Sequence, residues 1–256
     1  MLSRYSACGR IPSRWIFTIM AFALLSMLPF GAAAQGTGNP PVFAPGLHER
    51  TLARAGERGI GYAISIPPSY SSSTPTALIL ALHYGIGNRD STGVGVDLVK
   101  GIIGPALEGF GAIIVAPDSV RGNWSTSENE KAVNVLLDMV IARYAIDKKR
   151  VAVTGYSMGG TGSWHLAEKF PERFSAVLPI ASTPPASATG WRIPVLAIQS
   201  RDDQVVAFDP VAARIAELQK AGVNAKLITV TIAHHEAGRF REPLRQAVPW
   251  LQEVWK

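Results

Sequence analysis

The amino-acid sequence predicts an α/β fold, in which a mostly parallel central sheet has helices on both faces. Short apolar runs bounded by turn residues, such as GAIIVAPDS at 111–119, are typical of strands that are buried on both faces. Segments whose apolar residues recur at helical spacing, such as the one at 133–141, lie between these runs. Because strand-like and helix-like segments alternate and no internal repeat is present, one sheet covered on both faces explains the pattern.

The length of 256 residues and the hydrophobic content of 47% allow one sizeable core and leave little room for a second domain. Three arginines precede an apolar run that ends in AAAQ, which predicts a secretory signal peptide over 1–34, cleaved after Ala34. The alternative is a retained membrane anchor, but the run is short for a span and Pro29 interrupts it. A Gly/Pro-rich linker is expected at 35–46, followed by the α/β domain at 47–256.

The charge and cysteine content of the predicted mature chain exclude several classes of function. The formal net charge of +6 falls to +3 once the three arginines of the signal peptide are removed. That charge is too small to indicate a nucleic-acid partner, and no basic cluster with interleaved aromatic residues is present. Cys8, the only cysteine, lies upstream of the apolar run, so the mature chain is expected to have no disulfide, thiol nucleophile or Cys-based metal site.

The individual elements follow from the local patterns. Strands are expected within 62–68, 76–85, 111–119, 150–157, 174–182, 193–200 and 225–233. Helices are expected near 94–108, 133–141, 160–170, 210–222 and 242–255. Ser125 lies three residues before Glu128, which predicts a capping box at the start of the second helix. Pro249 predicts a bend or break in the last helix.

The stretch VAVTGYSMGG at 151–160 places a serine at the end of a buried strand. Ser157 is the centre of a G-x-S-x-G pattern, between a predicted strand and a predicted helix. A serine on so sharp a turn is crowded by the residues two before and two after it, and Gly155 and Gly159 occupy these positions. The alternative is a plain Gly-Ser turn, but the strand–turn–helix context favours a nucleophile at the carboxyl edge of the sheet.

A serine nucleophile needs a base and an acid that orients the base, in the chain order Ser, acid, His. Asp202 and Asp203 follow a strand, and Asp203 is preferred because acid-x-Val-Val precedes a helix there. His234 is preferred as the base because it directly follows a small residue at the end of the last strand, with His235 as the alternative. A zinc site is disfavoured because adjacent histidines do not converge on one ion, so no metal or cofactor is expected.

An anion formed on an attacked carbonyl also needs two hydrogen-bond donors. The amide of Met158, directly after the nucleophile, is the first candidate. The second is the amide of Gly85 in the loop LHYGIGN, with Tyr84 as the alternative. His83, in the same loop, is expected to be structural.

Taken together, these motifs resemble the α/β-hydrolase superfamily over 60–256, and most of all its compact secreted esterases. These are grouped with polyhydroxybutyrate-depolymerase-like, feruloyl and acetylxylan esterases and with dienelactone-hydrolase-like proteins. The resemblance rests on LHYGIGN, APDSVRGNW, the segment 146–182, SRDDQVV and AHHEAG. It implies a serine esterase that works through a Ser-Asp-His triad and an acyl-enzyme. Tyr84 departs from the family pattern, which commonly has the first glycine of an HG motif there.

The predicted site is open, because the link at 183–192 is too short to form a lid. An open site on an exported protein, whether secreted or periplasmic, suits short-chain or phenolic acyl groups carried on a polysaccharide or polyester. Trp124, Trp191 and Phe208 are candidates for the substrate rim, with packing roles as the alternative. The rival functions are a serine peptidase or acyltransferase on the same fold and a catalytically silent binding protein. Stable membrane association after cleavage is not expected.

Overall fold

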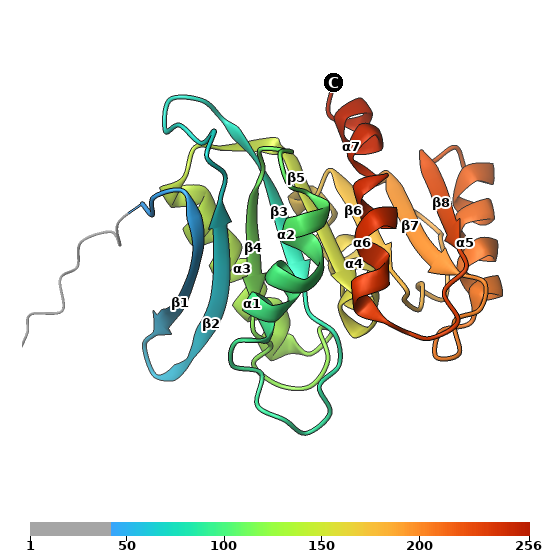
Figure 1. The fold of residues 1–256 in the computed structure, drawn as a ribbon, viewed down its shortest axis with the longest axis horizontal. Coiled ribbons are helices and arrows are strands. Elements are labelled where there is room, and N and C mark those ends of the chain that lie inside the picture. The colour runs from blue at the N-terminus through green and yellow to red at the C-terminus, as the bar shows by residue number, and fades with distance from the viewer. Residues whose placement is uncertain (1–41) are drawn as a thin grey trace, which may run out of the picture. The chain divides into compact units, whose positions relative to one another are not determined.

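The structure, a computed structural model, describes residues 42–256. In that part of the chain eight strands form one sheet with the order β1-β2-β4-β3-β5-β6-β7-β8 (Figure 1). The strands are β1 (Gly46–Arg54), β2 (Glu57–Ile66), β3 (Thr76–Leu82), β4 (Ile113–Pro117), β5 (Ile146–Tyr156), β6 (Ala176–Ile180), β7 (Val195–Ser200) and β8 (Ala225–Val230). From β4 to β8 the neighbours are parallel, whereas the β1–β2 and β2–β4 pairs are antiparallel. The predicted fold class is confirmed.

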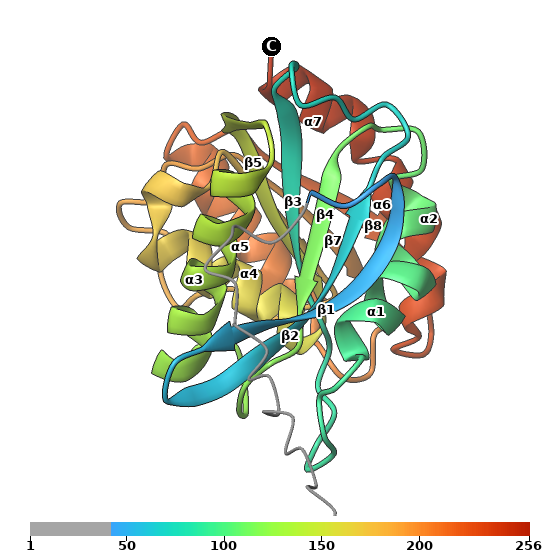
Figure 2. The same ribbon diagram turned by 90° about the vertical axis from the view of Figure 1, so that its left-hand side faces the viewer.

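Helices cover both faces of this sheet. They are α1 (Val94–Leu98), which continues through the π-helix η1 (Val99–Ile103) into α2 (Gly104–Ala106), and α3 (Ser127–Arg143), α4 (Met158–Lys169), α5 (Phe208–Lys220), α6 (Arg241–Arg245) and α7 (Val248–Val254). Short 3-10 turns lie at η2 (Pro171–Arg173) and η3 (Ala237–Phe240). Figure 2 shows α3, α4 and α5 on one side of the sheet and α1, α2, α6 and α7 on the other.

The core is divided by the sheet into two clusters, as the period of two along a strand requires. Leu78 and Leu80 of β3 pack in the cluster with α3, α4 and α5, whereas Ile79 and Ala81 pack in the cluster with α1, α6 and α7. Leucine and isoleucine side chains contribute about 1.5–3 kcal/mol each when fully buried. The apolar run at 76–85, predicted as a strand, therefore supplies residues to both halves of the core.

The first hairpin of the sheet was not predicted. β1 pairs with β2 in the register Thr51↔Gly61, and the turn between them contains Gly56 at φ +72°. Most β1 side chains are exposed, so this edge strand lacks the alternation by which a half-buried strand is recognised. β1 begins at Gly46, the last residue of the predicted linker. The predicted signal peptide lies outside the described residues.

Helix α3 begins one residue later than the sequence suggested. Thr126, and not Ser125, is the N-cap, and its hydroxyl accepts from the Asn129 amide at 3.3 Å. Ser125 instead donates to the side chain of Asn123 at 2.7 Å. The predicted capping box between Ser125 and Glu128 is wrong because this hydrogen bond within the loop engages the serine hydroxyl.

The C-terminal segment is broken into two helices, α6 and α7, which is the second of the two outcomes predicted for Pro249. The break lies before Pro249, which occupies the first turn of α7. Proline is well tolerated there because the amides of a first helical turn have no partner within the helix. The proline thus starts a helix instead of bending one.

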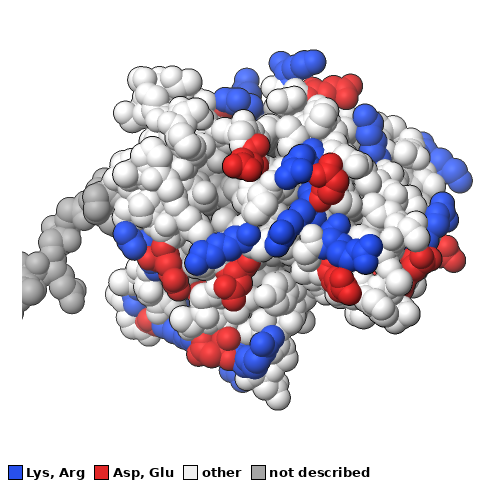
Figure 3. All heavy atoms as spheres, viewed as in Figure 1, with Lys and Arg blue, Asp and Glu red and all other residues white. Residues whose placement is uncertain are grey.

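Charged side chains of both signs are interspersed on the face that carries α1, α2 and α6 (Figure 3). Arg245 pairs with Glu242 at 2.6 Å and donates to the carbonyl of Pro105 at 2.9 Å. Exposed pairs contribute about 0–1 kcal/mol, so the burial of Leu244 and Phe240 holds this segment more firmly. Among residues 42–256, none of the helices is long and apolar enough to span a membrane.

Candidate active site

Ser157 lies on a strained turn between β5 and α4. Its backbone has φ 57° and ψ −118°, a combination that residues with a side chain rarely adopt. A Cβ at Gly159 would lie 1.9 Å from the carbonyl oxygen of Leu82, and one at Gly155 would lie 2.4 Å from the backbone of Gly159. The turn therefore requires glycine at both positions. The Ser157 amide donates to the carbonyl of Ile180 at 2.9 Å, which fixes the turn against β6.

An imidazole from the segment after β8 contacts this serine. His235 Nε2 lies 2.8 Å from Ser157 Oγ, and His235 Nδ1 lies 2.8 Å from Asp203 Oδ2. The Asp203 side chain is 1% exposed and the His235 side chain 14%. The structure thus brings three of the predicted side chains into one chain of hydrogen bonds.

The histidine that contacts Ser157 and Asp203 is His235, the alternative, and not His234, the first choice. His234 is exposed and its carbonyl accepts from the Glu236 amide at 2.7 Å. The prediction extended the last strand to Ala233, but β8 ends at Val230 and the chain then turns. This turn places the second histidine of the pair, and not the first, against Ser157.

The carboxylate of Asp203 is held by the loop that follows β7. Its Oδ1 accepts from the amides of Val205 at 2.8 Å and Val206 at 2.9 Å, while Oδ2 faces His235. Burial by itself raises the pKa of Asp203, but the amides of Val206 and Val205 and the imidazole together bring it below its usual value. An ionised Asp203 accepts a hydrogen bond from the Nδ1–H group of His235, which leaves Nε2 free to accept a hydrogen bond from the Ser157 hydroxyl.

Two neighbours of Asp203 complete this part of the site. Asp202, the alternative acid, is exposed and its amide donates to the hydroxyl of Ser200 at 3.2 Å. Gln199 was missed by the sequence analysis. It is fully buried at the end of β7, and its amide nitrogen donates to the carbonyl of Val206 at 3.0 Å. A polar amide in the otherwise apolar run VLAIQS was the signal that could have identified it.

The loop after β3 is fixed by His83, as its expected structural role requires. His83 is fully buried, and its Nε2 accepts from the Ser119 amide at 3.0 Å. The proton therefore sits on Nδ1, which donates to the carbonyl of Tyr84 at 2.7 Å. Burial lowers the pKa of His83 and keeps the ring neutral. Because the Tyr84 carbonyl and the Gly85 N–H belong to one planar peptide, this hydrogen bond also fixes the direction of that N–H.

The two residues predicted to supply oxyanion donors lie side by side. A Cβ at Gly85 would be 3.8 Å from the Cβ of Met158, the first residue of α4. The Met158 amide belongs to the first turn of that helix, where amides lack partners within the helix and favour negative charge. The donor pair itself remains a prediction, with Tyr84 as the alternative to Gly85.

Trp124 does not line the substrate rim, so that prediction is wrong. Its side chain is 1% exposed, and its indole N–H donates to the carbonyl of His83 at 2.9 Å. It packs on α4 where Gly162 leaves room, because a Cβ there would lie 2.4 Å from the Trp124 Cβ. Trp124 is therefore buried, and its hydrogen bond supports the loop of His83.

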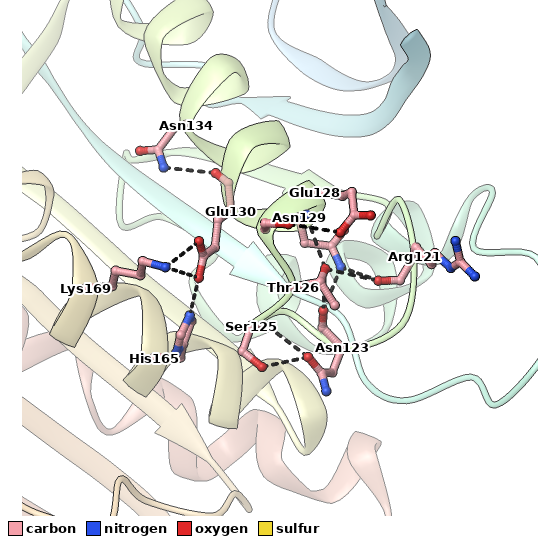
Figure 4. A network of polar contacts seen from close by, with 11 residues as sticks. Arg121, Asn123, Ser125, Thr126, Glu128, Asn129, Glu130, Asn134, His165 and Lys169 are labelled. Carbon is pink, nitrogen blue, oxygen red and sulfur yellow. Dashed lines mark hydrogen bonds and ion pairs between the residues drawn. The ribbon is translucent and has the colours of Figure 1, made fainter.

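The loop of Trp124 is itself tied to α3 by a buried amide (Figure 4). The side chain of Asn129 donates to the carbonyls of Arg121 at 2.8 Å and Asn123 at 2.7 Å. The next residue, Glu130, accepts from His165 at 2.7 Å and from Lys169 at 2.7 Å, which joins α3 to the helix after the nucleophile. Two adjacent side chains of α3 therefore hold both the loop and α4.

The other two rim candidates are half-buried. Trp191 packs edge-on against Trp164 at 5.2 Å between ring centroids and donates to the carbonyl of Ile193 at 2.7 Å. Phe208 lies beneath the guanidinium of Arg201, 4.5 Å from the ring centroid. Their contact with a substrate remains a prediction. Within 42–256, no group of three or more potential metal ligands is gathered at one place.

Comparison with solved structures identifies the fold around this site. The chain superposes on a thermostable esterase with a TM-score of 0.67 and 21% identity, covering 81% of this chain and 62% of that one. It superposes on a ferulic acid esterase with a TM-score of 0.66 and 15% identity, covering 81% and 98% of the two chains.

The chain has the fold of these esterases, an α/β-hydrolase fold. A family model described as a putative esterase matches residues 119–224, which include the turn of Ser157 and the loop of Asp203. The probable feruloyl esterase C of Aspergillus niger is 28% identical over 202 residues, 77% of this chain and 72% of that protein. The feruloyl esterase C of Emericella nidulans is 27% identical over 197 residues, 75% and 70% of the two chains. The predicted resemblance to esterases with this fold and the predicted enzyme class, a carboxylic ester hydrolase, are confirmed.

Proposed function

We propose that this chain is an exported serine esterase that cleaves phenolic or short-chain acyl esters through Ser157, His235 and Asp203. The observation that carries the proposal is the chain of two hydrogen bonds, each 2.8 Å long, from Ser157 Oγ through His235 to Asp203. A serine on a strained turn, a base within reach and an acid that orients the base form the arrangement that acyl transfer requires.

In the first step Ser157 Oγ attacks the ester carbonyl carbon while His235 Nε2 takes the hydroxyl proton. The imidazolium is stabilised by the ionised Asp203, whose charge faces Nδ1. The amides of Met158 and Gly85 receive the oxyanion, and each such donor is worth a factor of about 10² to 10³ in kcat. His235 then protonates the leaving alkoxide, so the alcohol departs and an acyl-serine remains.

In the second step water replaces the alcohol. His235 Nε2 takes a proton from the water as its oxygen attacks the acyl carbonyl. The bond between that carbon and Ser157 Oγ then breaks, His235 returns the proton to Oγ, and the carboxylic acid leaves. The same two amides stabilise the second tetrahedral intermediate. Both half-reactions use one base and one anion site, so the residues of this chain supply every proton transfer.

Phenolic acyl groups are the favoured substrates because the similar curated proteins are named feruloyl esterases. The link between β6 and β7 contains no helix or strand, which supports an open site able to accept a bulky alcohol such as a polysaccharide. The basic and apolar N-terminal pattern supports export, so the substrate is expected outside the cytoplasm.

The test compares methyl ferulate with acetyl-to-decanoyl p-nitrophenyl esters, using the wild type and Ser157→Ala. We expect turnover of methyl ferulate and of the shorter acyl chains, covalent labelling by a fluorophosphonate, and loss of both in the variant. Turnover equal to that of the variant on every ester would reject the esterase. Cleavage of aminoacyl amides together with labelling would instead indicate a peptidase.

A further inference from the structure

Tyr156, which directly precedes the nucleophile, contacts the base in two ways. Its ring stacks on the imidazole of His235, with 4.9 Å between the centroids and 29° between the planes. Its hydroxyl donates to the backbone carbonyl of His235 at 2.8 Å. One side chain, 3% exposed, thus holds both the ring and the backbone of the same histidine.

The segment that carries His235 has few other attachments. Upstream, the amide of Ile232 donates to the hydroxyl of Ser200 at 2.7 Å. Downstream, the buried ring of Phe240 packs against Tyr156 at 5.6 Å between centroids. Between Ile232 and Phe240, the backbone carbonyl of His235 accepts its hydrogen bond from the hydroxyl of Tyr156, as found within residues 42–256.

The hydroxyl of Tyr156 stays protonated, as a donor must. Burial raises the pKa of this phenol, and the negative charges of Asp203 and Glu236 raise it further. The hydrogen bond to His235 therefore persists over the whole pH range in which an esterase is assayed.

We propose that Tyr156 is a positioning residue that keeps the imidazole of His235 between Ser157 and Asp203. This inference rests on the proposed esterase function and names a further residue for it. The base must keep both 2.8 Å hydrogen bonds during the reaction, and a misplacement of about 1 Å can cost about 10²-fold in rate. The stacked ring restricts rotation of the imidazole, and the hydroxyl restricts movement of its backbone.

The test separates the two contacts. Tyr156→Phe removes the hydroxyl alone, and we expect kcat to fall about tenfold with KM changed less than about twofold, as loss of one hydrogen bond implies. Tyr156→Leu removes the ring as well, and kcat should fall about a hundredfold. Turnover is expressed per active site titrated with a fluorophosphonate, so that a smaller folded fraction does not count as slower catalysis.

Tyr144→Phe is the matched control. Tyr144 is 4% exposed, lies in the other core cluster, and its hydroxyl accepts from the Phe43 amide at 3.3 Å. Loss of the Tyr144 hydroxyl should lower Tm without changing kcat per titrated active site. An equal fall of kcat in Tyr144→Phe, or an unchanged kcat in Tyr156→Phe, would overturn the positioning role.

A proton NMR measurement keeps this inference separate from the esterase assignment. The Nδ1 proton of His235, which faces Asp203, should give a low-field resonance that is absent from His235→Ala. We expect this resonance to broaden or vanish in Tyr156→Phe and to persist in Tyr144→Phe. If the wild type turns over no ester, the esterase is rejected, and the resonance still decides on Tyr156, because its survival in Tyr156→Phe overturns the proposal.

Discussion

Replacement of Gly159 by alanine tests how tightly the nucleophile turn is packed. The new Cβ would lie 1.9 Å from the carbonyl oxygen of Leu82 and 2.7 Å from that of His83, whereas real Cβ contacts essentially never fall below 3.0 Å. The end of β3 and the start of α4 must therefore separate by more than 1 Å. This shift moves two parts of the proposed active site apart, because Ser157 lies at the start of α4 and the loop of Gly85 follows β3.

A separation of about 1 Å predicts a fall in kcat of about 10²-fold. The movement that accommodates the new Cβ should lower the free energy of unfolding by about 3–5 kcal/mol. In a domain of this size, that change lowers Tm by about 10 °C. The matched control is Gly101→Ala in the π-helix η1, where a Cβ meets nothing within 4 Å. That change should raise stability by about 0.5–1 kcal/mol. The two variants and the wild type are compared by kcat from steady-state kinetics and by Tm from thermal unfolding. A Gly159→Ala protein with wild-type kcat and Tm would refute this close packing of the turn.

Two further predictions concern the groups around the triad. His83→Gln should lower kcat about 10²-fold with little change in KM, because the Tyr84 carbonyl loses the hydrogen bond that orients the peptide group carrying the Gly85 N–H. An equal fall of kcat in His165→Gln would argue against this role. The pKa of Asp203 is lower in the folded state than in the unfolded chain, where it is about 3.9. Asp203 therefore stabilises the folded state at pH values above about 3.9, and this contribution is lost as the pH falls through the folded-state pKa. The Tm difference between wild type and Asp203→Asn should therefore shrink from about pH 6 to about pH 2, and a difference independent of pH would contradict it.

Much of the fold could be predicted because the chemistry is local. The strands β3, β4, β6 and β7 are short apolar runs buried on both faces, and Gly155 is required by a contact within the turn, because its Cβ would lie 2.4 Å from the backbone of Gly159. The edge strand β1 could not be predicted, because its mostly exposed residues carry little periodicity. Its position depends on pairing with β2, which only the folded sheet provides.

The choice between His234 and His235 shows the limit for the site. The two residues are adjacent and chemically identical, so the decision depends on the residue at which β8 ends. Trp124 shows a second limit, since its place beside His83 depends on a close approach to Gly162 of α4. Both outcomes depend on tertiary contacts that local sequence patterns do not specify.

The most direct test of the central claim compares His235→Ala with His234→Ala on one chromogenic ester, at equal concentrations of folded protein. Removal of the base of such a triad lowers kcat by about 10⁴-fold or more. We predict that loss for His235→Ala, and a kcat within about threefold of wild type for the exposed His234→Ala. A large loss in His234→Ala together with retained turnover in His235→Ala would contradict the assignment of Ser157, His235 and Asp203.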